Sequence, residues 1–297
     1  MVVGAAEDEA AVLMRVLVTG AAGQLGHDVV ATCEAKWDRV VARAHADLDI
    51  TDRSAVLGVV ASERPDVVVN CAAWTAVDAC ESDPELAFRR NAMAVRFLVE
   101  ACDRAGAHLV HVSSDYVFDG TKPDAYHEWD VTNPTSIYGA SKRAGELEAL
   151  AAGAGACVVR TSWVCGEYGN NMVTTILRLA GDHDTLRFVD DQIGHPSFTA
   201  DLAPMIRRIA LDRVSGVVHL TNQGPVSWCG FAKAVLAAAG LDPDRVSPIT
   251  TAELQPARPA RRPANSRLDN QALRFAGYDA LDDFRRPLGE LVGRLLA

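Results

Sequence analysis

Cysteine motifs, long apolar runs and positive charge are all scarce in this sequence. The seven cysteines are an odd number and form no Cys-x-x-Cys pair, which argues against a disulfide framework or a zinc knuckle and favours a reducing cytoplasm. No apolar run approaches the roughly 20 residues of a membrane span, so we expect no membrane association. The formal net charge of −10 at pH 7 disfavours nucleic acid as a partner.

The composition is that of a globular protein. Hydrophobic residues make up 49% of the 297, which is enough for one large domain or two modest ones. Residues 1–13 carry three acids and no basic residue, so they make a poor signal peptide. We expect them to form a disordered tail before a fold that begins near Met14.

Apolar segments alternate with segments of helical spacing after this tail. Strands are expected at 15–20, 38–43, 66–73, 107–114 and 156–164, and helices at 24–35, 53–64, 84–106 and 141–153. The strands are apolar throughout, as in a parallel sheet that is covered on both faces. The sequence therefore predicts an α/β fold, with a doubly wound, Rossmann-like sheet in residues 14–164 that binds a dinucleotide.

Residues 165–297 follow a looser pattern. Helices are expected at 170–181, 198–211, 227–240 and 283–296, and short strands at "TLRFV" and "GVVHL". We interpret this part as mainly a smaller, irregular C-terminal domain that binds the substrate, with some segments returning to the first domain.

Three glycines lie between the first strand and the first helix. Gly20 permits a tight turn, Gly23 lets a pyrophosphate approach the backbone, and Gly26 lets the helix pack closely on the strand. The helix N-terminus then presents free N–H groups to the phosphates. In this context the triplet predicts a dinucleotide site rather than a glycine-rich turn without a ligand.

A hydroxyl, a phenol and an ammonium are expected to converge at the carboxyl edge of the sheet. Ser114 ends the fourth strand, and Tyr138 lies one helical turn before Lys142. A phenol with a pKa near ~10 is a poor catalyst at neutral pH, and we expect the Lys142 cation to lower that pKa. Tyr138 would then exchange a proton with a substrate oxygen that Ser114 also contacts. Each residue alone is more often a surface or turn residue.

Arg43 ends the second predicted strand. NAD-binding folds usually place an acid there for the ribose 2′-hydroxyl, whereas the nearest acid in this sequence is Asp47. A guanidinium suits a 2′-phosphate, because it makes charge-assisted contacts. NADPH is therefore predicted to be preferred and NADH tolerated; the alternative is an exposed loop arginine.

These motifs together resemble the extended short-chain dehydrogenase/reductases. Within that superfamily, the sequence looks like the dTDP-4-dehydrorhamnose reductases. The matching stretches are spread over residues 15 to 268 and include "SSDYVFDG", "NPTSIYGASKRAGE", "DDQIGHPS" and "ARRPANSRL". The resemblance implies reduction of the C4 keto group of dTDP-4-dehydro-L-rhamnose by NADPH, which makes dTDP-L-rhamnose for cell-wall polysaccharide. In that family the position of Ser114 is often Thr, and either hydroxyl can donate.

The resemblance also implies contacts around both ligands. The expected cofactor contacts are Gly23, Gln24 and Leu25 for the pyrophosphate, Asp49 and Ile50 for the adenine, and Ala73, Trp74 and Thr75 for the nicotinamide. Asp115 and Trp163 would contact the sugar nucleotide, and Asn91 would hold the active-site geometry beside the cofactor. Some members are linked to magnesium, but no carboxylate cluster in this sequence demands a metal.

An arginine cluster offers a place for the substrate diphosphate. Residues 255–267 hold four arginines and no acid: Arg258, Arg261, Arg262 and Arg267. In so acidic a chain such a cluster can focus a diphosphate, so we predict that Arg261 and Arg262 bind the nucleotide sugar. The alternative is a solvated basic loop.

Two other functions stay open at this point. One is a different nucleotide-sugar epimerase, reductase or dehydratase; a dehydratase normally has an acidic pair after the triad hydroxyl, whereas Asp115 is followed by Tyr116. The other is a non-catalytic NADP-binding subunit, like the regulatory subunit of methionine adenosyltransferase, against which the intact triad argues. The sequence leaves open whether the protein is a monomer or a homodimer.

Overall fold

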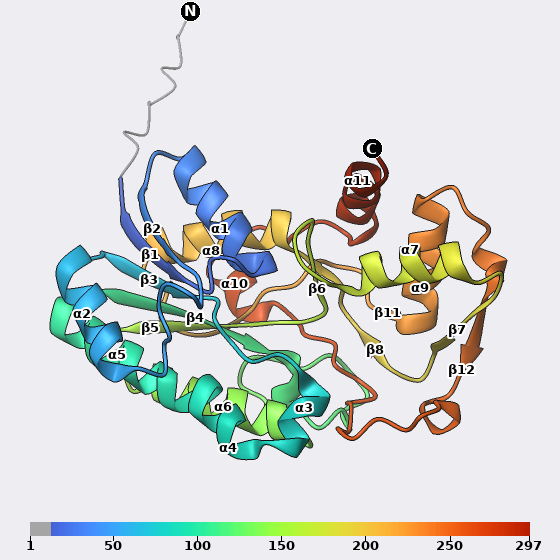
Figure 1. The fold of residues 1–297 in the computed structure, drawn as a ribbon, viewed down its shortest axis with the longest axis horizontal. Coiled ribbons are helices and arrows are strands. Elements are labelled where there is room, and N and C mark those ends of the chain that lie inside the picture. The colour runs from blue at the N-terminus through green and yellow to red at the C-terminus, as the bar shows by residue number, and fades with distance from the viewer. Residues whose placement is uncertain (1–12) are drawn as a thin grey trace, which may run out of the picture.

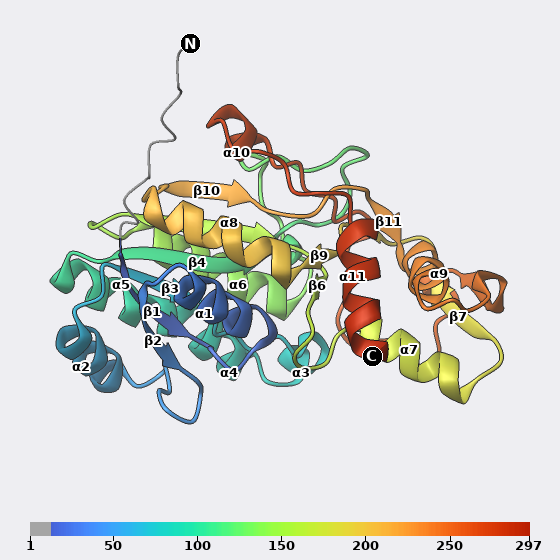
Figure 2. The same cartoon turned by 90° about the horizontal axis from the view of Figure 1, so that it is seen from above.

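The computed structural model describes residues 13–297 (Figures 1 and 2). The tail expected at residues 1–13 therefore lies, apart from Leu13, outside the described residues. No helix in the described part of the chain is long and apolar enough to cross a membrane.

A six-stranded parallel sheet forms the centre of the molecule. In spatial order its strands are β10 (Gly216–His219), β5 (Ala156–Thr161), β4 (His108–Ser114), β3 (Val67–Asn70), β1 (Arg15–Thr19) and β2 (Arg39–Arg43). The predicted doubly wound α/β fold is confirmed. The strand order reverses between β1 and β3, and ligands of such sheets bind beyond the carboxyl ends at this switch point.

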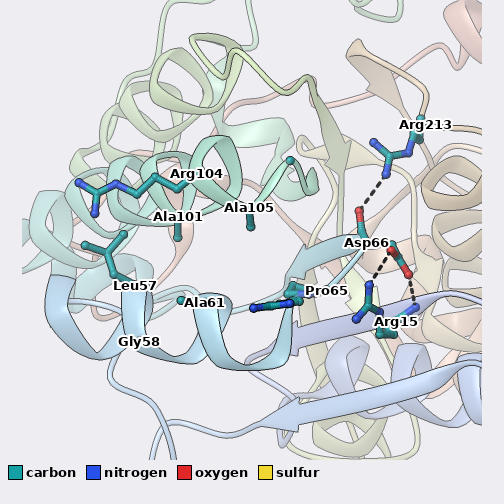
Figure 3. Close-up of a pocket in the computed structure, with 12 residues that line it drawn as sticks. Arg15, Leu57, Gly58, Ala61, Pro65, Asp66, Ala101, Arg104, Ala105 and Arg213 are labelled. Carbon is teal, nitrogen blue, oxygen red and sulfur yellow. Dashed lines mark hydrogen bonds and ion pairs between the residues drawn. The ribbon is translucent and has the colours of Figure 1, made fainter.

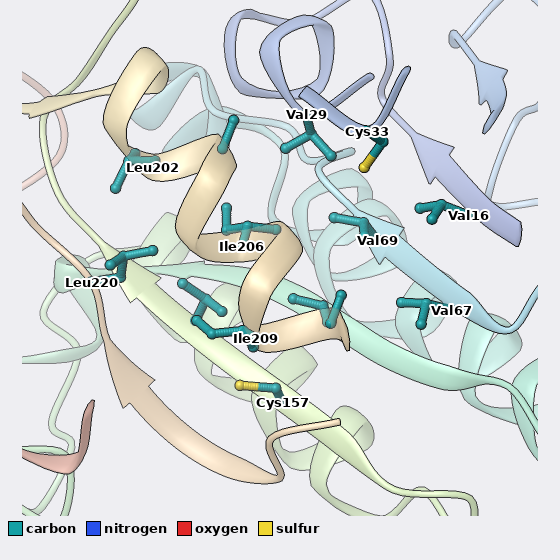
Figure 4. Packing of buried hydrophobic residues seen from close by; sticks show 14 of the residues in the cluster. Val16, Val29, Cys33, Val67, Val69, Cys157, Leu202, Ile206, Ile209 and Leu220 are labelled. Atoms are coloured by element: carbon teal, nitrogen blue, oxygen red, sulfur yellow. The ribbon is translucent and has the colours of Figure 1, made fainter. Parts of the chain in front are cut away.

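Helices cover both faces of the sheet. They are α1 (Gln24–Ala35) and α8 (Thr199–Leu211) on one face, and α2 (Arg53–Glu63), α5 (Ala94–Ala105) and α6 (Ile137–Leu150) on the other (Figure 1). Val16 of β1 packs in one core with Val29 and Ile206 (Figure 4), whereas its neighbour Leu17 packs in the other core with Leu98. Because successive strand side chains point to opposite faces, a strand such as β1 carries apolar residues on both faces.

A second unit has its own core beside the sheet, on the right of Figure 1. It comprises α7 (Met172–Asp182), α9 (Trp228–Ala238) and α11 (Arg285–Leu296), with β7 (Leu186–Val189) paired to β12 (Val246–Ile249). The connecting elements are β6 (Val164–Cys165), β8 (Ile193–Gly194), β9 (Ser197–Phe198) and β11 (Val226–Ser227). Helix α10 (Gln271–Phe275) packs on β10, in the first unit. Although α8 and β10 follow residue 165, they pack on α1 and beside β5, in the first unit.

Three local features differ from the predicted elements. The helix expected at 84–106 consists of α4 (Pro84–Phe88), a π-helical turn (Arg89–Met93) and α5. A helix that the pattern did not predict, α3 (Val77–Ser82), precedes it. The strand expected at 156–164 ends at Thr161, because Trp163 adopts a left-handed φ of 45° that a strand cannot continue through.

Candidate active site

The glycine loop between β1 and α1 is shaped for a phosphate-bearing cofactor. Gly20 has a φ of 70°, and a Cβ on it would lie 2.6 Å from the backbone nitrogen of Ala72. A Cβ on Gly26 would lie 2.2 Å from the carbonyl oxygen of Gly20. No side chain caps the first turn of α1, so its N–H groups face the loop without a side-chain partner. These residues fit a dinucleotide pyrophosphate, which needs close backbone approach and N–H donors.

Two adjoining cavities, of about 430 and 560 Å³, open beside this loop and share Ala22, Gly23, Cys71 and Ala73. The first is also lined by the predicted residues Gly20, Asp49, Ile50 and Trp74. The second is also lined by Gln24, Leu25, Gly26, Thr75, Ser114, Asp115, Tyr138, Lys142 and Trp163. The structure therefore brings most of the predicted site residues around one continuous space.

A larger cavity, of about 650 Å³, lies elsewhere in the molecule, between α2 and α5 (Figure 3). Its rim carries Arg15, Arg64, Arg104 and Arg213, and Arg15 pairs with Asp66 at 3.4 Å. None of the predicted site residues lines it. Size alone therefore does not identify the active site in this fold.

The three triad residues are positioned by the ends of β4 and α6. Ser136 caps α6 by accepting a hydrogen bond from the Gly139 N–H at 3.2 Å, so the helix begins at the residue before Tyr138. Ser114 Oγ donates to Asp115 Oδ1 at 2.8 Å. Lys142 Nζ donates to the Val112 carbonyl oxygen at 2.7 Å. Tyr138 and Lys142 are both buried.

Burial controls the protonation of this site. It raises the pKa of Tyr138, which a hydrogen bond with Ser114 opposes, and lowers the pKa of Lys142 to about 8. It also raises the pKa of Asp115 to about 6. The prediction that the Lys142 cation would leave Tyr138 with a lowered pKa is therefore wrong, because desolvation of the phenolate is the larger effect. Tyr138 keeps its proton at neutral pH and can donate it to a substrate oxygen.

Asn91 lies on the π-helical turn and lines neither cavity. Its Oδ1 accepts from the Trp74 N–H at 2.8 Å, and its Nδ2 donates to the Trp74 carbonyl at 3.1 Å and to Ser141 Oγ at 3.0 Å. The buried amide thus joins the loop that carries Trp74 to α6. Asn91 is therefore suited to hold the Trp74 loop and α6 in place. It lies on the π-helical turn, and such turns are common at functional sites.

Trp163 forms one wall of the second cavity. Its ring stacks on that of Trp228, with centroids 3.4 Å apart and planes 7° apart. A Cβ on Gly194 would lie 2.6 Å from Trp163 Cε2, so a glycine is needed at that position for the ring to fit. Trp228 also lines the cavity, and the sequence interpretation missed it, since a tryptophan at a helix start carries no distinguishing pattern.

The structure does not bring Arg43 to the first cavity. Its guanidinium donates to Glu63 Oε1 at 3.1 Å, and the residue is not among those lining the space. His45 and Arg90 line the cavity instead. Hydrogen bonds from Thr51 hold the pKa of Asp49 below its usual value, and the charges of His45 and Arg90 add to this effect. Sequence reasoning missed both residues, although His45 follows the end of β2 by only two positions.

The arginine loop lies near the second cavity, but neither Arg261 nor Arg262 lines it. Arg262 makes a bidentate ion pair with Asp78 of α3, at 2.6 and 2.7 Å, and hydrogen-bonds Tyr116, which lines the cavity. Arg261 is exposed and lines neither cavity. Within residues 13–297, no group of three or more His, Cys, Asp and Glu side chains is arranged to hold a metal ion.

Comparison with known proteins gives a consistent family. The family described as RmlD substrate binding domain matches residues 14–296. A dTDP-4-dehydrorhamnose reductase of Streptomyces griseus is 43% identical over 284 residues, which cover 93% of this chain and 92% of that protein. The crystal structure of a dTDP-4-dehydrorhamnose reductase of Clostridium acetobutylicum matches with a TM-score of 0.92 and 38% identity, over 96% of this chain and 100% of that one. Another, from Bacillus anthracis in complex with NADP, matches with a TM-score of 0.89 and 36% identity, over 96% and 99%.

Proposed function

Because this chain belongs to the RmlD substrate binding domain family, we propose that it is an oxidoreductase that uses NADPH to reduce dTDP-4-dehydro-L-rhamnose at C4, giving dTDP-L-rhamnose. The observation that carries this proposal is geometric: the buried Tyr138 lines one cavity together with Ser114, Lys142 and the glycine loop. A reduction of a ketone needs a proton donor at the carbonyl oxygen, next to the hydride source.

The residues divide this chemistry among them. NADPH, when bound, supplies the hydride. When the substrate is bound, the Ser114 hydroxyl turns from Asp115 Oδ1 to donate to the C4 oxygen, and so stabilises the charge that develops on that oxygen. Tyr138 gives its proton to the same oxygen, and the nearby Lys142 ammonium stabilises the phenolate that remains. Asn91 holds α6 and the Trp74 loop in register, so that donor and acceptor stay within reach.

The function is tested by mixing the protein with NADPH and dTDP-4-dehydro-L-rhamnose and following the absorbance of the reduced cofactor. We expect NADPH to be consumed in a one-to-one ratio with product. An epimerase would convert the sugar without net loss of NADPH, and a non-catalytic subunit would bind NADPH without turnover; either result would reject the proposal.

The preference for NADPH is proposed to depend on His45 and Arg90 rather than on Arg43. Both line the cofactor cavity, whereas Glu63 neutralises Arg43 outside it. We expect His45→Ala and Arg90→Ala each to reduce the ratio of kcat/KM for NADPH over NADH by about tenfold, the usual worth of one charged hydrogen bond. Arg43→Ala should leave this ratio nearly unchanged. Loss of the preference only in Arg43→Ala would show that Arg43 leaves Glu63 to bind the 2′-phosphate.

Arg262 is proposed to serve the nucleotide sugar, because it lies against Tyr116 at the substrate cavity. Arg262→Ala should raise KM for the sugar nucleotide about tenfold, with little change in the Kd for NADPH, since binding shared by ground and transition states affects KM. Arg261→Ala is the matched control; its exposed side chain should contribute much less. A fall in NADPH affinity in Arg262→Ala would mean that this loop serves the cofactor instead.

A further inference from the structure

A buried ion pair lies behind the catalytic residues. Glu146 is on α6, two turns after Tyr138, and its side chain is fully buried; the Arg160 side chain on β5 is 3% exposed. Arg160 Nε donates to Glu146 Oε1 at 2.7 Å, and Arg160 Nη2 donates to Glu146 Oε2 at 2.8 Å. Such a pair is costly to desolvate and is stable only when its remaining hydrogen-bonding positions are filled.

The surrounding groups fill these positions from several elements. Ser113, next to Ser114 on β4, donates to Glu146 Oε1 at 2.7 Å, and Arg143 donates to Oε2 at 3.0 Å. Arg160 Nη1 donates to the Glu128 carbonyl at 3.2 Å, and its guanidinium lies 5.1 Å from the centre of the Phe118 ring. The pair therefore joins α6, which carries Tyr138 and Lys142, to β4, which carries Ser114, and to β5.

Lys142 has few charged neighbours besides this pair. The titratable groups that act on it are Cys71 after β3, His111 on β4 and Glu146 on its own helix. Tyr138 lies one turn before it on the same helix. Burial raises the pKa of Cys71 to about 12 and lowers that of His111 well below its usual value. Burial raises the pKa of Tyr138 as well, so all three are neutral near pH 7. Glu146 is then the one anion among these neighbours, and it raises the pKa of Lys142, which burial alone would depress further.

We propose that Glu146, held by Arg160, is a positioning residue that keeps the buried Lys142 charged and fixes α6 against the strand ends that carry Ser114. The proposal rests on the role of Lys142 in the proposed function. The effect on the Lys142 charge and the effect on the position of α6 can be tested separately. Glu146→Gln removes the negative charge and keeps the shape of the side chain, whereas Glu146→Asp keeps the charge and shortens the side chain.

The charge of the Lys142 side chain is measured directly on the cofactor-free protein. The sequence has only four lysines, Lys36, Lys122, Lys142 and Lys233, so selective isotopic labelling of lysine gives four side-chain NMR signals to titrate. The signal missing from Lys142→Arg identifies Lys142. We expect its midpoint near pH 8 in the unmodified protein and in Glu146→Asp, and about one pH unit lower or more in Glu146→Gln. Arg143→Ala, which leaves the Glu146–Arg160 pair in place, should keep the midpoint.

Binding and turnover report the same shift. A lysine is charged below its pKa, so NADPH affinity and kcat/KM should fall as pH rises through about 8 in the unmodified enzyme and about one unit earlier in Glu146→Gln. Glu146→Asp should keep this pH profile and lower kcat. A change in thermal stability alone, with the Lys142 midpoint and the pH profile unmoved in Glu146→Gln, would overturn the proposal.

A second variant covers the case in which Glu146→Gln does not fold. The double variant Glu146→Gln with Arg160→Gln removes both buried charges, which proteins tolerate better than one unpaired charge. Loss of the Arg160 cation by itself favours charged Lys142, so the comparison is with Arg160→Gln alone. The double variant should have a lower Lys142 midpoint than Arg160→Gln, and equal midpoints would reject the role of Glu146. Since this titration needs neither sugar nor turnover, its failure is distinguishable from failure of the proposed reductase activity.

Discussion

Replacing Tyr138 with phenylalanine is expected to lower kcat by about two to four orders of magnitude, the usual contribution of a positioned proton donor. The Kd for NADPH should change little, because the ring and its packing against Tyr116, with centroids 5.4 Å apart, are kept. Steady-state kinetics together with fluorescence titration of NADPH measure both quantities.

Tyr278→Phe is the control for this substitution. The Tyr278 hydroxyl donates to Asp212 at 2.7 Å at the end of α8 and lines neither active-site cavity, so its loss should leave kcat unchanged. Turnover of Tyr138→Phe near that of the unmodified protein would remove Tyr138 as the proton donor.

Gly26→Ala should have the second large effect, on both stability and cofactor binding. The new Cβ would lie 2.2 Å from the Gly20 carbonyl oxygen, so the backbone of the phosphate loop must move. Overpacking against rigid backbone costs about 2–3 kcal/mol of unfolding free energy, and the displaced loop should weaken NADPH binding tenfold or more. Denaturant unfolding and NADPH titration measure these effects.

Gly58→Ala is a matched control, because Gly58 is also helical but a Cβ on it would meet nothing within 4 Å. It should raise stability by about 0.5–1 kcal/mol, the difference in helix propensity, and leave NADPH binding as it is. Unchanged stability and NADPH affinity in Gly26→Ala would contradict the close approach of loop and helix.

The sequence was sufficient to predict the main sheet, because the apolar pattern of a strand is a local property of the sequence. Strands such as "RVLVT" and "VVVN" are apolar on both faces, which a parallel sheet between two helical layers requires. The π-helical turn and the early end of β5 were not predictable, because both depend on tertiary contacts. The π-helical turn presents Asn91 to Trp74 and Ser141, and the left-handed Trp163 packs on Trp228, which lies 65 residues later in the chain.

Side-chain direction and desolvation limited the prediction of the site. Arg43 does end β2, as expected, but Glu63 from α2 holds its guanidinium outside the cofactor cavity. The spacing of Tyr138 and Lys142 is also as expected, yet burial, which no local pattern reports, is the largest influence on the pKa of Tyr138 and raises it. Most of the residues that form the site could be predicted from the sequence, whereas their charge states required the packed structure.

The central claim, transfer of hydride to C4 of the sugar, is tested most directly with NADPH that carries deuterium at both hydrogen positions on C4 of its nicotinamide ring. After reaction with dTDP-4-dehydro-L-rhamnose, the product should be dTDP-L-rhamnose with one deuterium at C4 of the hexose, located by NMR and counted by mass spectrometry. One equivalent of NADPH should be oxidised for each sugar reduced. A product without deuterium, deuterium at another carbon, or conversion of the sugar without net oxidation of NADPH would contradict the account.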